Sequence, residues 1–150
     1  MIIKALLDEL FMQIKEFIDF DNIGIYKIIS DKEYQRYYYS PKNKLEYYDV
    51  DIVMEKIIKE ECLSEITKLK KEILIKDSDI LNEKISMNLI PIMFEEEVVF
   101  FLNLLTNKKF DVSEEIKEKV LELIDSFSEV FCFEEMMKVD MIRDRMSLDF

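Results

Sequence analysis

The segment Val98–Thr106 constrains the fold more than any other part of the chain, because a strand over these residues is apolar on both faces. Val98, Phe100, Leu102 and Leu104 alternate with Val99, Phe101, Asn103 and Leu105. Such a strand has to lie in the middle of a sheet that is covered on both sides. The turn Glu95–Glu97 joins it to a second apolar strand over Met87–Phe94, so the pattern predicts a hairpin in the body of the sheet.

The patterns before this hairpin switch between the helical period and strand alternation. The predicted elements are a helix from Ile3 to Ile18, a hairpin of Ile23–Ile29 and Glu33–Tyr39, a helix over Asp51–Thr67, a strand over Glu72–Ile75 and a polar connection over Lys76–Lys84. The sequence therefore predicts an α+β fold: a central antiparallel sheet flanked by helices, with the N- and C-terminal helices packed together on one face.

A long amphipathic helix is predicted at the end of the chain. Asp111 or Ser113 can accept hydrogen bonds from the N–H groups of its first turn, and Glu114 and Glu115 suit the positive end of its dipole. Its apolar stripe continues to Met146 with no glycine or proline to end it. About 30 helical residues span roughly 45 Å, which exceeds the width of such a domain.

This overhang needs a cover, and the simplest one is the same helix of a second copy, with help from the N-terminal helix. The sequence therefore predicts a homodimer. The residues expected in the dimer interface are Leu7, Ile14, Phe127, Phe131, Met137 and Met141. Methionine suits a seam that repacks between two arrangements, because its thioether side chain is flexible.

Composition argues against several classes of function. The net charge of −12 repels phosphate backbones, so we expect no nucleic acid partner. No apolar run reaches the roughly 20 residues that span a bilayer and no signal-peptide pattern occurs, so we expect a cytoplasmic protein with no membrane partner. The chain has no histidine, the commonest general base and metal ligand, and its adjacent carboxylates do not converge. We expect no catalytic residues, metal or cofactor, and we expect Cys62 and Cys132 to be core residues.

The segment that follows the central hairpin resembles part of a GAF domain. Some GAF domains that bind cyclic nucleotides carry an Asn-Lys pair, a variable spacer, a Phe, three residues and an Asp-Glu pair. The order here is Asn107-Lys108, Lys109, Phe110, three residues and Glu114-Glu115, with a one-residue spacer and Glu in place of Asp. An alternative role for Phe110 is to seal the edge of the hairpin. The resemblance covers roughly residues 3–133 and implies a sensory or dimerisation module rather than an enzyme.

A ligand pocket in such a domain is expected between the sheet and the helix and loop after the first hairpin. Its walls here would be Tyr37, Tyr39, Met54, Ile58, Ile75, Asp79, Asn88 and Asn103. Asn103 stands out as an amide on an apolar strand, which needs a partner in a ligand, a buried water or the core itself. The tyrosines suit stacking on a flat ligand, and they equally suit core packing.

The tail Arg145–Phe150 resembles the junction at which a signalling helix enters a GGDEF diguanylate cyclase domain; the alternative is a frayed helical tail. We accordingly divide the chain into a GAF-like domain over residues 1–133 and an extension of the last helix over 134–150.

Together the two resemblances imply a cytoplasmic sensory domain that dimerises and controls an attached output domain of a longer protein, with cyclic-di-GMP synthesis as the expected output. A ligand-free scaffold for dimerisation or protein docking is the alternative function. A PAS domain, which also places a sheet before a signalling helix, is the alternative fold.

Overall fold

The computed structural model describes residues 2–40, 47–80, 83–107 and 112–148 of the chain. Along these ranges, groups of helices and groups of strands follow one another, as expected for an α+β protein. The elements are α1 (Ile2–Phe17), β1 (Asn22–Ser30), β2 (Glu33–Tyr39), α2 (Tyr47–Lys59), α3 (Cys62–Leu69), β3 (Ile73–Ile80), β4 (Glu83–Phe94), β5 (Glu97–Thr106) and α4 (Glu114–Leu148).

The strands form one five-stranded antiparallel sheet in the order β2-β1-β5-β4-β3. β5 lies in the middle, where Leu102 is opposite Ile25 of β1 on one side and Ile90 of β4 on the other. The prediction of a central strand that is apolar on both faces is therefore confirmed.

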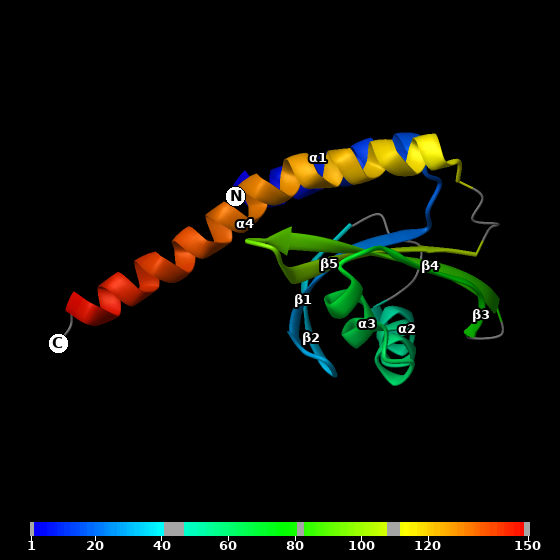
Figure 1. The fold of residues 1–150 in the computed structure, drawn as a ribbon, viewed down its shortest axis with the longest axis horizontal. Helices are drawn as coiled ribbons and strands as arrows, with labels where there is room; N and C mark the ends of the chain where they lie inside the picture. Colours follow the sequence, from blue (N-terminus) through cyan, green and yellow to red (C-terminus); the bar gives the residue numbers. More distant parts are fainter. Residues whose placement is uncertain (1, 41–46, 81–82, 108–111, 149–150) are drawn as a thin grey trace.

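Helices cover both faces of this sheet, and each face has its own core (Figure 1). α1 and α4 cover one side, here called the α1/α4 face, where Phe100, Leu102 and Leu104 of β5 are buried. α2 and α3 cover the opposite side, the α2/α3 face, where Phe101 and Leu105 are buried. The alternation of β5 thus supplies both cores from one strand, because successive side chains point to opposite faces.

The middle of the chain holds two helices where one was predicted. Glu61 lies between α2 and α3 in the left-handed region, with φ 59° and ψ 27°, and this residue interrupts the helical hydrogen bonding. Val53 and Ile57 before the break and Leu63 after it are all buried in the same core. The prediction of a continuous helix is wrong, because a bend lets both short helices pack on one twisted sheet face.

β3 and β4 are longer than predicted and take up most of the expected polar connection. Their pairing continues through Ser78 opposite Ile85 and on to Ile80 opposite Glu83. β3 is an edge strand, so polar side chains along it can remain in water while its backbone hydrogen bonds are made to β4. A search for alternating apolar residues misses this part of the β3–β4 pairing, because most of the residues that pair here are polar.

A β-bulge changes the direction of the side chains along β2. Ile25 is opposite Tyr38 while the next residue, Tyr26, is opposite Arg36, so Tyr37 is the extra residue of the bulge. As a result Tyr37 and Tyr38 both pack on the α1/α4 face, and Tyr39 packs on the α2/α3 face.

α4 is the longest element and confirms the predicted long terminal helix. The Oγ of Ser113 accepts a hydrogen bond from the N–H of Ile116 at 3.3 Å, as expected of an N-cap, whereas Asp111 lies outside the described residues. α4 runs antiparallel to α1 and continues well past it (Figure 1).

Candidate functional site

Most of the predicted pocket residues meet on the α2/α3 face. Met54 of α2 is fully buried in the core of this face, and the partly buried residues that pack against this core include Tyr39, Ile58 and Ile75. Asn103 joins them from β5, because its Nδ2 lies 3.8 Å from Sδ of Met54 and donates to it. The candidate ligand site therefore combines an apolar helix face with one central amide.

The amide of Asn103 is the unusual group in this site. The residue is 1% exposed, and its Oδ1 has no hydrogen-bond partner within the described part of the chain. A buried amide oxygen without a partner costs about 1–3 kcal/mol relative to one that is hydrogen-bonded. A donor placed against this oxygen would recover that free energy.

Aromatic side chains form the wall of the site next to Asn103. The rings of Tyr26 and Phe101 stack with centroids 5.2 Å apart, and Tyr34 meets Tyr26 edge-on at 5.8 Å. The guanidinium of Arg36 lies 5.0 Å from the centre of the Tyr39 ring. Burial, followed by the nearby Tyr39, raises the pKa of Tyr26 above its usual value, so its hydroxyl stays neutral. This wall is therefore mainly aromatic, and Arg36 adds a cationic side chain to it.

The other predicted pocket residues do not join this group. Tyr37 faces α4 because of the bulge, and its ring meets those of Phe100 and Phe131 at 5.4 and 5.1 Å. Asn88 also faces the α1/α4 side, because its neighbours Met87 and Leu89 take the α2/α3 side of β4. The side chain of Asp79 lies outside the described residues. The predicted set thus divides between two faces of the sheet.

The described residues among those predicted for the dimer interface lie in or against the core of the α1/α4 face. Leu7, Ile14 and Phe131 are buried in the core of the α1/α4 face, and Phe127 is partly buried against it. They therefore fill the core of a single copy instead of pointing outward, because α1 and α4 use their main apolar stripe to cover the sheet. The side chains of Met137 and Met141 lie outside the described residues. Among the described side chains of the two helices, the exposed large apolar ones are Met12, Phe17, Val130 and Phe133.

The cysteines are far from a catalytic arrangement. Both are free and buried, Cys62 in the core of the α2/α3 face and Cys132 in that of the α1/α4 face. Burial, followed by the charges of Glu60 and Glu65, raises the pKa of the Cys62 thiol to about 11. A thiol that remains protonated at neutral pH is a weak nucleophile.

Neither a metal cluster nor a membrane span occurs in the described part of the chain. No three side chains of His, Cys, Asp or Glu come together there as metal ligands. None of its helices combines the length and the apolar character needed to cross a bilayer.

Comparison with known proteins identifies the fold of this chain. No protein-family model matches the sequence, and no curated protein matches it at a significant level. Among solved structures, a GAF domain/HD domain protein from Geobacter sulfurreducens has a TM-score of 0.69 and 11% identity over 89% of this chain and 94% of that chain. The GAF domain of a two-component sensor histidine kinase from Bacillus halodurans has a TM-score of 0.63 and 14% identity over 89% and 96%.

An enzyme shares the same architecture. A type II free methionine-R-sulfoxide reductase from Thermoplasma acidophilum has a TM-score of 0.58 and 12% identity, over 87% of this chain and 94% of that chain. The sheet order, the helices on both faces and these similarities together define the fold of this chain as that of a GAF domain. The GAF resemblance found in the sequence is thereby confirmed at the level of the fold, and the PAS alternative is not.

Proposed function

We propose that the chain is a GAF-type sensory or regulatory domain of the cytoplasm, which forms a homodimer and controls an output domain attached after α4. The observation that carries this proposal is α4 itself, a single helix that begins against the sheet and continues to Leu148. The resemblance of the tail to a GGDEF junction favours cyclic-di-GMP synthesis as the output.

The proposed signal begins at Asn103. A small molecule with an N–H or O–H donor placed against Oδ1 would satisfy that oxygen, while Nδ2 keeps its contact with Sδ of Met54. On either side of Asn103 along β5, Leu102 and Leu104 point to the opposite face, into the core that also contains Val120 and Ile124 of α4. Any shift of β5 caused by a ligand would therefore change the packing of α4, since closely packed cores move in discrete steps.

The exposed apolar side chains of α4 supply the proposed dimer contact. Val130 is 47% exposed and Phe133 is 60% exposed, one turn apart on the same helix. Neighbouring exposed apolar side chains of this size are typical of interaction surfaces. Phe17, at the end of α1, is 39% exposed but lies near Lys119 and Glu122 of α4, away from this pair.

Native mass spectrometry and sedimentation of the whole chain test this dimer. We expect a dimer for the natural sequence and a monomer for the double variant Val130→Glu/Phe133→Glu. The matched control is the double variant Ile29→Glu/Met93→Glu, which introduces the same two charges at exposed apolar positions of β1 and β4 and should leave the dimer intact. A monomeric natural protein would exclude the proposed transmission through paired helices.

A ligand-free scaffold for dimerisation or protein docking is the second candidate. The stack of Tyr26 on Phe101, with Tyr34 against its edge, favours it, because these side chains already fill part of the candidate site. The substitution Asn103→Leu separates the two functions. A sensor purified with a bound small molecule would show extra mass that this variant loses, whereas a scaffold would show the bare mass in both proteins.

We propose no catalytic role, although a reductase shares the fold. Cys62 and Cys132 lie in cores on opposite faces of the sheet and are 4% and 2% exposed. They have neither the access nor the closeness to each other that thiol redox chemistry requires. Purified protein should accordingly fail to reduce free methionine sulfoxide in the presence of dithiothreitol.

A further inference from the structure

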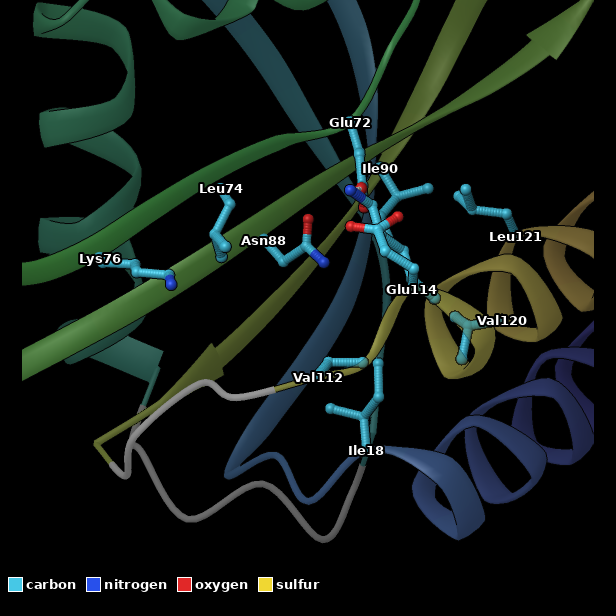
Figure 2. Close-up of a pocket in the computed structure, with 11 residues that line it drawn as sticks. Ile18, Glu72, Leu74, Lys76, Asn88, Ile90, Val112, Glu114, Val120 and Leu121 are labelled. Carbon is cyan, nitrogen blue, oxygen red and sulfur yellow. Dashed lines mark ion pairs between the residues drawn. The ribbon is translucent and has the colours of Figure 1, made fainter.

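A cavity of about 190 Å³ lies on the α1/α4 side of the sheet, across the sheet from Asn103. It is bounded by β3, β4 and the first turns of α4, with Ile18 closing it from the end of α1 (Figure 2). Ile90 and Val112 give it an apolar floor, and Val120 adds a wall from α4. A volume of this size holds a small organic molecule or about six waters, at about 30 Å³ for each water.

Asn88 is the buried polar group of this cavity. It is 6% exposed, and its Oδ1 has no hydrogen-bond partner among the described residues. Figure 2 shows its amide directed from β4 toward Glu72 and Glu114. Its cross-strand neighbour on β3 is Leu74, which cannot provide a hydrogen bond. A buried amide oxygen that is left without a donor indicates a missing partner.

The charged side chains that line the cavity are two carboxylates, Glu72 and Glu114, and two ammonium groups, Lys76 and Lys117. Glu72 is largely buried and forms an ion pair with Lys117, so one oxygen of its carboxylate is occupied. The exposed carboxylate of Glu114 lies in the first turn of α4, where it offsets the positive end of the helix dipole with Glu115. Lys76 also lines the rim, and its side chain is exposed to water.

We propose that this cavity binds a small primary amine in its ammonium form, with a branched apolar tail. The three N–H donors of an ammonium group match the three acceptors, which are Oδ1 of Asn88 and the carboxylates of Glu72 and Glu114. The apolar tail matches Ile90, Val112 and Val120, and the net charge of −12 attracts a cation. This site is separate from the candidate site at Asn103 and does not depend on the proposed sensory role.

The test is an NMR titration of the whole chain with isopentylammonium chloride, compared with isopentanol and isovalerate, which carry the same tail. We expect saturable shifts of the Asn88 side-chain amide and of the methyl groups of Ile90 and Val112. Hydrogen bonds to charged groups are the stronger kind, so we expect isopentanol to bind about tenfold more weakly and isovalerate not to saturate.

Three variants make the assignment specific. Asn88→Leu should weaken binding of isopentylammonium about tenfold, and the control Glu115→Gln, which removes a neighbouring exposed carboxylate that does not line the cavity, should leave it unchanged. If Asn88→Leu does not fold, Glu114→Gln at an exposed position gives a second test and should also weaken binding. Equal affinity for isopentanol, preference for isovalerate, shifts centred on Asn103, or the absence of saturation would each overturn the proposal.

Discussion

The hydroxyl of Tyr38 donates a hydrogen bond to Oδ1 of Asp8 at 2.5 Å and thereby connects the edge strand β2 to α1. The ring of Tyr38 also stacks on Phe11 of the same helix, with centroids 5.7 Å apart. Burial, followed by the hydrogen bond and charge of Asp8, raises the pKa of Tyr38 to about 12. Tyr38 faces α1 because it is opposite Ile25, whose side chain lies in the core of the same face.

Tyr38→Phe should lower the free energy of unfolding by about 1 kcal/mol, because it removes the hydrogen bond and keeps the ring stack. A double-mutant cycle with Asp8→Ala, measured by urea denaturation, isolates the contribution of the pair. If Tyr38→Phe lowers the free energy of unfolding by as much in the Asp8→Ala background as in the natural protein, the hydrogen bond between Tyr38 and Asp8 is not the cause of the destabilisation.

The same pair makes stability depend on alkaline pH. The folded chain holds the Tyr38 proton more tightly than the unfolded chain, whose tyrosine pKa is 10, so this stabilisation is complete below pH 10 and disappears as pH rises toward 12. Tyr26, whose pKa is also raised, acts in the same direction. Urea titrations between pH 10 and 12 should show that the free energy of unfolding falls less for Tyr38→Phe than for the natural protein. An equal fall in the two proteins would contradict the prediction.

Ser113→Ala should destabilise the protein by about 1 kcal/mol, because it removes the side-chain acceptor for the N–H of Ile116. Ser113→Asp is the matched control, since its carboxylate can accept the same hydrogen bond and also suits the helix dipole. Thermal and urea denaturation check both variants. A similar loss in Ser113→Asp would show that the effect does not arise from capping.

The hairpin of β4 and β5 is strained at its turn. Glu95 and Glu96 have φ values of 51° and 68°, in the left-handed region that a two-residue hairpin turn of this type requires and that Asn and Gly adopt more readily. Glu95→Asn/Glu96→Gly should stabilise the protein by about 1 kcal/mol in urea denaturation. Glu95→Ala removes a charge without relieving the backbone, so an equal gain in that variant would assign the effect to charge repulsion.

Gly24, the only glycine of the chain, lies in close contact with two tyrosine side chains. A Cβ atom there would lie 3.1 Å from both Cε2 and the hydroxyl oxygen of Tyr26, and 3.2 Å from Cδ2 of Tyr39. Tyr26 cannot move away easily because it stacks on Phe101. Gly24→Ala should therefore cost about 1–2 kcal/mol by urea denaturation. A neutral or stabilised variant would mean that the Tyr26 ring shifts off Phe101 at little cost.

Sequence patterns predicted the parts of the fold that depend on periodicity. The double apolar character of Val98–Thr106 placed β5 at the centre of the sheet, and the terminal stripe predicted α4 with Ser113 as one of two possible caps. The break at Glu61 could not be found in this way, because the apolar spacing continues across it and no glycine or proline marks it.

The candidate site was predicted only in part because a sheet has two faces. Met54, Ile58, Ile75, Tyr39 and Asn103 share one face, as expected. Strict alternation along β2 puts Tyr37 on the same side as Tyr39, but the extra residue of the bulge sends Tyr37 to the other side. For Asn88 a signal was present in the sequence, since its parity on β4 matches Ile90 and not Met87 or Leu89.

The uninterrupted course of α4 has a rotational consequence. A continuous helix transmits angular position as well as distance, and each inserted residue turns everything beyond it by about 100°. One added residue after Phe133 would thus point the following segment in a new direction, while seven added residues, about two turns, nearly restore the original one. The packing of α4 on the sheet therefore sets the rotational position of the last turns of this helix.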